Sequence, residues 1–160
     1  MVEFAFVAPL GFLLLLSIIV TAIIVTNFIQ VTNIARDGAR VAAICGSVPG
    51  TPMPDGSGPC TGAAISTYIT QHLLDIPNGQ VTPAIHVCTP SQVVSGTCSS
   101  TSSCGALQTI CQCQAGKIVE VDMSYPQPLY LPIVSNLLQS PGSTNGTRLL
   151  MASAQATCEQ

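Results

Sequence analysis

An uninterrupted apolar segment near the N-terminus is the feature that most limits what this chain can fold into. From Phe4 to Ala35 there are 32 consecutive residues without a formal charge, and residues 4–25 include fifteen Phe, Leu, Ile or Val. A helix that spans the hydrocarbon core of a bilayer needs about 20 such residues. At roughly −0.3 to −0.6 kcal/mol each, these side chains favour insertion by about 4–9 kcal/mol in total. The segment therefore predicts a membrane-spanning helix, which a simple cytosolic globule would not contain.

This segment differs from a cleaved secretory signal. Such a signal has a shorter apolar core, a basic start and a cleavage site of small residues. Here the apolar run is longer, and no basic residue precedes it. We therefore expect the segment to be retained in the mature protein.

The same helix is predicted to continue beyond the apolar run, to about residue 45. Small and apolar residues recur there every three or four positions, which indicates one buried helix face. A helix over residues 4–45 would be about 60 Å long, twice the ~30 Å thickness of the hydrocarbon core. Its outer half should therefore carry a folded head. The stripe consists of Phe28, Val31, Ala35, Gly38, Ala42 and Cys45.

The eight cysteines all lie outside the apolar run, in a chain of which only 7% is charged. An even number in a small, charge-poor domain favours disulfides formed in an oxidising compartment, although the sequence does not assign their pairing. Zinc binding and free thiols are weaker alternatives, because no two cysteines have the spacing of a Cys-x2–4-Cys zinc pair. We expect a head outside the cytoplasm, with no metal and no cofactor. The disulfide candidates are Cys45, Cys60, Cys88, Cys98, Cys104, Cys111, Cys113 and Cys158.

The remaining patterns predict a small antiparallel sheet. Alternation of apolar and polar residues is typical of half-buried strands, and apolar residues at every fourth position indicate a short amphipathic helix. The expected fold is α+β, a pilin-like architecture of one long N-terminal helix (domain 1–45) and a disulfide-stapled β-sheet head (domain 46–160). The expected elements of the head are a Pro/Gly-rich loop at 46–62, a helix at 63–74, strands at 80–88, 117–125 and 148–158, a Ser/Thr-rich loop at 89–103, and a Pro- and Gly-punctuated segment at 126–146.

Charge and motif content exclude several functions. The net charge is −3 and the four basic residues are scattered, whereas a nucleic-acid surface needs clustered Lys and Arg. Glu120 and Asp122 are the only acids that share a strand face, and a solvated face is favoured over a paired-carboxylate site. His72 and His86 are isolated in the sequence, and no nucleophile elbow or phosphate loop is present. We expect a protein that is not an enzyme and does not bind nucleic acid.

Two stretches of the sequence resemble the TadE-like family, the pseudopilins of tight-adherence (Tad) pili within the type IV pilin group. The opening VEFAFVAPL at residues 2–10, the leucine and isoleucine run, and the motif ARDGAR at residues 35–40 carry the N-terminal part of this resemblance. A C-terminal part covers residues 117–158, with VEVDMSY at residues 119–125 followed by a Pro/Leu segment and a last strand. The cysteine-rich middle lies outside the resemblance.

The resemblance implies a structural subunit of an extracellular pilus filament that serves surface attachment. Its implied partners are identical subunits, the cytoplasmic membrane before assembly, a prepilin peptidase that removes a basic leader after a Gly, and the pilus assembly machinery. Loss of that leader would explain why Arg36 and Arg40 follow the span although the cysteines favour an exported head. In the family, a glutamate five residues after the cleavage site pairs with the N-terminal ammonium of a neighbour, and Glu3, third in this sequence, would take that role. The helix-packing residues expected in the filament are Phe4, Phe6, Leu10, Leu13, Leu14, Ile18, Ile24 and Phe28.

A second hypothesis needs no polymer. The helix could be a single-span anchor for a monomeric, disulfide-rich extracellular binding domain, in which the Ser/Thr-rich loop makes the contacts. Helix length, Glu3 and the resemblance favour the filament subunit, and a plain anchor would tolerate loss of the Glu3 carboxylate.

Overall fold

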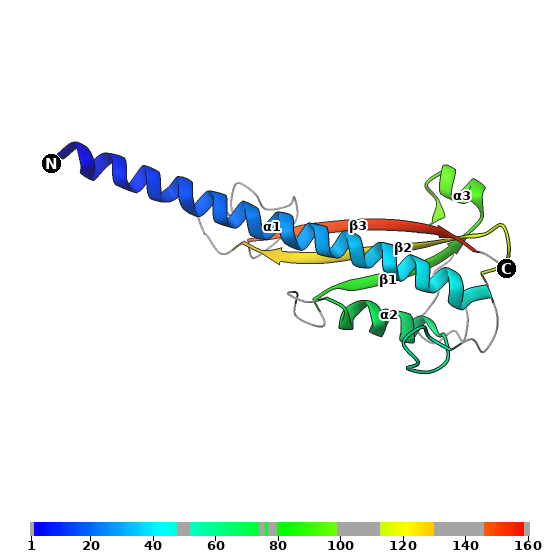
Figure 1. The fold of residues 1–160 in the computed structure, drawn as a ribbon. Coiled ribbons are helices and arrows are strands. Elements are labelled where there is room, and N and C mark those ends of the chain that lie inside the picture. The colour runs from blue at the N-terminus through cyan, green and yellow to red at the C-terminus, as the bar shows by residue number, and fades with distance from the viewer. Residues whose placement is uncertain are drawn as a thin grey trace.

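The computed structural model describes residues 2–47, 52–73, 76, 80–98, 113–129 and 146–158, and along the first helix it describes the side chains of residues 7–45. One long helix projects from a small head in which a sheet lies against the helix (Figure 1). This arrangement confirms the expected α+β fold. The elements in chain order are α1 (Val2–Ser47), α2 (Gly62–Gln71), β1 (Thr82–Cys88), α3 (Pro90–Val94), β2 (Ile118–Pro128) and β3 (Thr147–Thr157).

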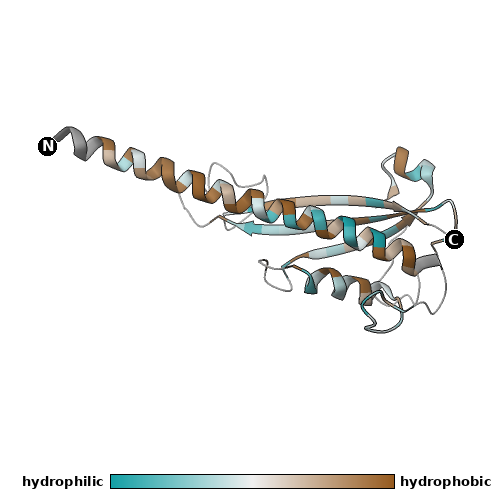
Figure 2. Cartoon of the chain, viewed as in Figure 1, coloured by the Kyte–Doolittle hydropathy of each residue, from teal (hydrophilic) through white to brown (hydrophobic). Residues whose placement is uncertain are grey.

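α1 is one continuous helix of 46 residues that includes Pro9. At 1.5 Å per residue it is about 69 Å long. Its N-terminal part extends beyond the sheet and is mainly hydrophobic, whereas hydrophilic positions appear along the part that lies over the head (Figure 2). The predicted helix is therefore confirmed, and it is slightly longer at both ends than the sequence pattern indicated.

The three strands form an antiparallel sheet in the order β1-β2-β3. In the middle strand Val121 is opposite Ile85 of β1 and Ala154 of β3. Alternate residues of β2 are buried, as the period of two predicted. Both α1 and α2 contact the sheet, and the buried face is the one they cover. The buried residues of β2 are Val119, Val121, Met123, Tyr125 and Gln127.

The stripe that joins α1 to the head begins one residue earlier than expected. Phe28 is 46% exposed, whereas Asn27 is only 8% exposed. Val31, Ala35 and the later members of the stripe are buried as predicted. The helical repeat of 3.6 residues places Asn27, not Phe28, four residues before Val31 on the same face.

The short helix α2 begins at a side-chain cap. The Thr61 hydroxyl accepts a hydrogen bond from the Ala64 amide at 3.0 Å, which satisfies one of the free N–H groups of the first turn. Ile65, Ile69 and Leu73 are all buried, as their spacing predicted. The helix ends at Gln71, before the predicted end at residue 74.

Two further expectations need correction. The Ser/Thr-rich segment 89–103 is not wholly a loop, because Thr89 and Gln92 form a capping box that starts the single-turn α3. β2 also continues to Pro128, into the segment expected to be irregular. Its pairing with β1 ends at Ser124, opposite Thr82, so Pro126 and Pro128 pair with β3 alone. A proline is tolerated in a strand where one side has no partner that needs its N–H.

Three disulfides connect the elements of the head. Cys45–Cys60 joins the end of α1 to the loop before α2, Cys88–Cys98 spans α3, and Cys113–Cys158 joins the residues that flank β2 and β3. Their Cα–Cα distances of 5.3, 5.6 and 5.4 Å lie in the usual range for disulfides. Cys104 and Cys111 lie outside the described residues. The disulfide-stapled head predicted from the cysteine count is thereby confirmed for six of the eight.

Candidate assembly surface

The projecting half of α1, residues 7–26, is apolar and, apart from partly buried positions such as Ile24, uncovered. None of its described side chains is buried by the head. Leu13, Leu14 and Leu15 are 50%, 60% and 53% exposed. Phe12, the residue before them, is 63% exposed, and because consecutive helical residues point about 100° apart, these four residues make the helix surface apolar on all sides. A surface of this kind needs apolar surroundings all around it, from lipid or from several neighbouring helices.

Two threonine hydroxyls within this half are satisfied by the helix itself. The hydroxyls of Thr21 and Thr26 donate to the backbone carbonyls of Ser17 and Ala22, at 2.8 and 2.9 Å. A hydroxyl bonded to the carbonyl four residues earlier costs little when water is excluded. These threonines are therefore compatible with an apolar environment.

The helix-packing residues expected from the sequence fall into three groups. Leu10 and Ile18 are 71% and 62% exposed, and Leu13, Leu14 and Phe28 are also exposed. Ile24 instead packs against the core of the head. Three expected residues belong to the first turns of α1, but their side chains are outside the described part of the chain: Glu3, Phe4 and Phe6.

A buried pair of amides marks the point where the projecting half meets the head. Asn27 Nδ2 of α1 donates a hydrogen bond to Gln127 Oε1 of β2. Gln127 is 1% exposed, and its own amide nitrogen donates to the Pro128 carbonyl at 3.2 Å. The sequence did not predict this pair, because 100 residues separate its members. The signal was present in the alternation of β2, which places Gln127 on the buried face.

The ARDGAR motif, residues 35–40, has a buried side and an exposed side on α1. Ala35, Gly38 and Ala39 are buried against the head. A Cβ at Gly38 would lie 2.7 Å from Ile69 Cδ1 of α2, so glycine is what allows the two helices to approach this closely. Arg36 and Arg40 are exposed on the other side of the helix. The motif therefore combines a close-packing face with a charged face.

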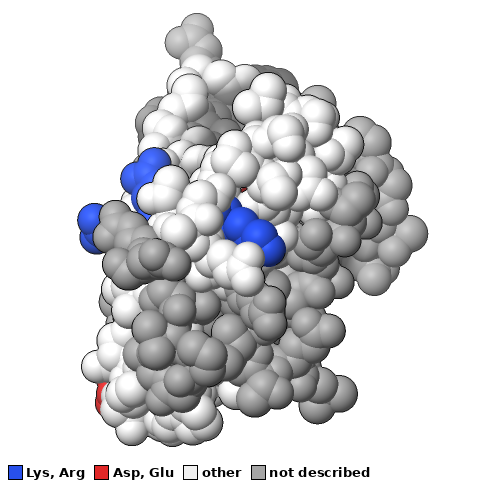
Figure 3. All heavy atoms as spheres, turned by 90° about the vertical axis from the view of Figure 1, so that its right-hand side faces the viewer, with Lys and Arg blue, Asp and Glu red and all other residues white. Residues whose placement is uncertain are grey.

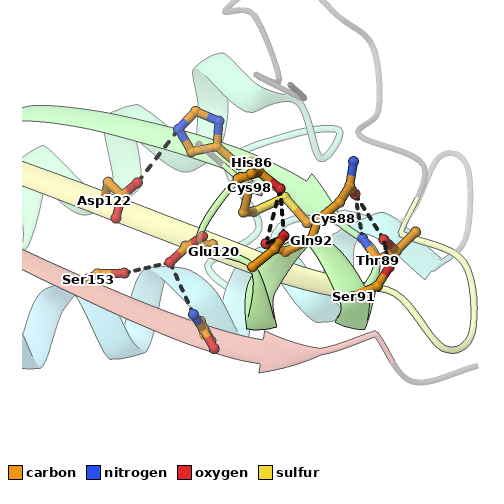
Figure 4. Close-up of a disulfide and its surroundings, with 12 residues drawn as sticks. His86, Cys88, Thr89, Ser91, Gln92, Cys98, Glu120, Asp122 and Ser153 are labelled. Atoms are coloured by element: carbon orange, nitrogen blue, oxygen red, sulfur yellow. Dashed lines mark hydrogen bonds and ion pairs between the residues drawn. A yellow bond between two sulfur atoms is a disulfide. The ribbon is translucent and has the colours of Figure 1, made fainter. Parts of the chain in front are cut away.

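A cluster of polar side chains lies on the sheet face opposite α1. Glu120 Oε1 accepts hydrogen bonds from Ser153 Oγ and Gln155 Nε2, both at 3.0 Å. Asp122 Oδ2 lies 3.7 Å from Nε2 of the buried His86. Figure 4 shows these groups on one side of the strands, beside the Cys88–Cys98 disulfide.

This cluster has the geometry of a hydrogen-bonded strand face. Glu120 binds neutral side chains of β3, and Ser153 is bonded to this carboxylate and not to His86, so the serine and the histidine do not form a nucleophile–base pair. Within the described residues, no group of three or more His, Cys, Asp or Glu is placed to hold a metal ion. The sequence missed the approach of His86 to Asp122 because it depends on the register between β1 and β2.

One carboxyl group of the head has a shifted pKa. The hydroxyl and the amide of Ser57 both donate to Asp55 Oδ1, at 2.7 and 3.0 Å, and these bonds lower the pKa of Asp55 below its usual value. The two residues lie in the exposed loop that precedes Cys60, away from the projecting helix.

Length and composition make α1 able to cross a membrane. The candidate span within it covers Val7–Cys45, and its most apolar stretch has a mean hydropathy of 2.7 with no part buried in the head. A core helix of a soluble protein would be mostly covered. The structure therefore defines a class of protein in which one apolar helix projects from a small disulfide-stapled head.

Comparison with known families gives a match over most of α1. Residues 1–40 match a family model described as TadE-like protein. The N-terminal part of the resemblance is thereby confirmed, and it relates this protein to the Tad pilus; the part over residues 117–158 stays a prediction. No curated protein matches the chain, and no solved structure does.

Proposed function

We propose that this protein is a structural subunit of a pilus filament, a pilin or pseudopilin that polymerises through α1. The observation that carries the proposal is the all-round apolar surface of residues 7–26 on a helix whose other half is built into the head. Before assembly, this surface would lie in the cytoplasmic membrane. In the filament, the same surface would be buried among α1 helices of identical subunits.

Energetics support transfer from lipid to a helix bundle. Fully burying a Leu, Ile or Phe side chain contributes about 1.5–3 kcal/mol relative to water, so the projecting half has to remain covered at every stage. Side chains such as Leu10, Phe12 and Ile18 are each more than 60% exposed in the single chain. Packing against like helices replaces lipid contacts with protein contacts and keeps water excluded.

The outer surface of the head suits dense packing outside the cell. Among the described residues on the face shown in Figure 3, Lys, Arg, Asp and Glu occupy only small areas. Few charges mean little repulsion between crowded identical neighbours. The three disulfides are typical of exported domains. The TadE-like family is structural rather than catalytic, so no reaction is assigned to the Glu120 and Asp122 face.

Glu3 is proposed to act in assembly. It lies in the first turns of α1, at the end of the helix farthest from the head. A carboxylate there needs a cationic partner once it is surrounded by apolar helices. The N-terminal ammonium of a neighbouring subunit, freed by a prepilin peptidase, would supply that charge.

The test is non-reducing intact-mass spectrometry of filaments sheared from the surface of cells that make this protein. We expect this chain to dominate the fraction, with a processed N-terminus and a mass lower by two hydrogens for each disulfide. Glu3→Ala should abolish the filaments while the chain still enters the membrane, and Asp55→Ala is the matched control that removes a carboxylate from the head. Recovery of the chain only from detergent-extracted membranes, with none in sheared filaments, would contradict the proposal and favour a monomeric anchored domain.

A further inference from the structure

An open groove runs between α1 and the edge strand β3. Its volume is about 870 Å³. β3 has a strand neighbour on one side only among the described strands, so its other edge presents backbone N–H and C=O groups toward this region. The residues that line the groove are mostly polar. They are Asn33, Arg36, Asp37, Arg40, Ser153, Ala154 and Gln155.

Two arginines of this groove have no acidic partner in the described part of the chain. Arg36 and Arg40 lie one helical turn apart and are both exposed. The only ion pair found among the described residues joins His86 to Asp122. Asp37 lines the same groove, so the two arginines and this aspartate give the groove a formal net charge of +1. Two of the four basic residues of the whole chain are therefore placed together, and guanidinium groups favour planar carboxylate partners.

A surface of opposite charge lies on the other face of the sheet, and it adjoins the groove at β3, where Ser153 and Gln155 line the groove and bond Glu120. Glu120 and Asp122 form an acidic face on β2, on the opposite side of the sheet from α1 (Figure 4). The hydrogen bonds from Ser153 and Gln155 to Glu120 use one carboxylate oxygen, Oε1, and the Asp122 side chain is 36% exposed. Among the described residues neither arginine forms an ion pair with Glu120 or Asp122 of its own chain, so both surfaces are available to a second copy.

We propose that the groove of Arg36 and Arg40 binds the Glu120 and Asp122 face of a second copy of this chain. This inference rests on the proposed function and specifies how neighbouring heads recognise each other in the filament. A contact between two different surfaces of one chain is heterologous, and repeated heterologous contacts generate open helical assemblies. Opposite charges at such a contact select the correct neighbour and fix its position, since like charges there oppose association.

The first test is charge reversal in the full-length protein in cells that form filaments. Arg36→Glu with Arg40→Glu should reduce sheared filaments at least about tenfold, because every contact would then bring like charges together. Glu120→Arg with Asp122→Arg should have the same effect, and the quadruple variant should restore filaments. Lys117→Glu with Arg148→Glu is the matched control, because it reverses two basic residues outside the groove and should leave filament yield unchanged. Normal filaments from either double variant, or no recovery in the quadruple variant although its disulfides form, would overturn the inference.

A second test does not require any charged residue to be changed. A photo-reactive amino acid at Asn33, an exposed residue that lines the groove, should cross-link to the outer face of β2 from another copy in intact filaments. Cross-links to lipid, to a different protein or to another part of the head would overturn the inference. The two proposals fail differently: absence of wild-type filaments contradicts the proposed function, whereas wild-type filaments that cross-link elsewhere contradict only the groove contact.

Discussion

The two halves of α1 belong to one continuous helix but meet their surroundings in opposite ways. Residues 7–26 carry large apolar side chains and contain no buried residue, whereas from Asn27 to Cys45 small residues such as Ala35 and Ala39 are almost fully buried. One face of the head-bound half is covered within the molecule by the sheet and α2, whereas Phe28 and Ile44 on its other side remain exposed. The apolar side chains of the projecting half are shielded from water only when lipid or other copies of the chain surround them. The buried face of the head-bound half folds the subunit, whereas the apolar surface of the projecting half is available for assembly.

The largest expected effect is a charge in the projecting half. The Leu14 side chain is 60% exposed in the single chain and should be covered in the filament, so Leu14→Lys would place an ammonium group in apolar surroundings. A lysine near the middle of a span costs about 3 kcal/mol on the insertion scale. We expect sheared filaments to be lost, while denaturant unfolding of the head, followed in detergent, keeps its midpoint. An unchanged filament yield would contradict the separation of the two halves, and Leu14→Ile is the control that keeps the position apolar.

In the head, loss of the Cys113–Cys158 disulfide should have the largest effect on stability. The bond closes a loop with a sequence separation of 45, compared with 10 for Cys88–Cys98. From the loop-entropy relation, replacing both cysteines by serine should lower the free energy of unfolding by about 4 kcal/mol for the long loop and about 3 kcal/mol for the short one. Chemical denaturation of the two double variants measures both values. Equal or reversed losses would show that loop length does not decide the effect.

α1 has a glycine in each half, Gly11 in the projecting half and Gly38 in the head-bound half, and the same substitution at both tests how closely each half is packed. Nothing lies within 4 Å of a Cβ at Gly11, whereas a Cβ at Gly38 would lie 2.7 and 2.9 Å from atoms of the buried Ile69. We expect Gly38→Leu to destabilise the head by about 3 kcal/mol, at the upper end of the usual range for overpacking. Gly11→Leu should leave the unfolding of the head unchanged. If both variants unfold at the same denaturant concentration, close packing at Gly38 does not hold α1 on α2.

The sequence predicted the parts of the fold that depend on local periodicity. The long helix, the alternation in β2 and the buried face of α2 all follow from residue spacing, and the structure confirms them. The apolar run and ARDGAR also pointed to the family whose model matches residues 1–40. These features could be read from the sequence because each is encoded within one segment.

Features that depend on contacts between distant segments were not predicted. The pairing of the cysteines, the approach of His86 to Asp122 and the Asn27–Gln127 hydrogen bond each require the register of one element against another. Phe28 was placed in the stripe because it is apolar and lies three residues before Val31, but the buried residue is Asn27, four residues before Val31. A polar residue can occupy a buried position when its partner lies far away in the chain, and hydrophobicity alone does not reveal such a position.

The amide pair at the boundary between the two halves gives the smallest and most specific prediction. Asn27→Leu removes the donor and leaves Gln127 Oε1 without this hydrogen bond on a side chain that is 1% exposed, which should cost about 2 kcal/mol. Replacing both residues by leucine removes the unsatisfied group, so most of the lost stability should return. Denaturant unfolding of the two single variants and the double variant forms a double-mutant cycle that measures the coupling.

The same cycle tests what the pair does for assembly. A shift of the sheet by one turn along α1 would move the head by about 5.4 Å and separate the two amides, so their hydrogen bond favours one position of the head on the helix. If this is its role, the double leucine variant should regain stability but give fewer or less regular filaments than the wild type, as seen by electron microscopy. Full recovery of both stability and filament order would show that apolar packing alone fixes where the head-bound half ends and the projecting half begins.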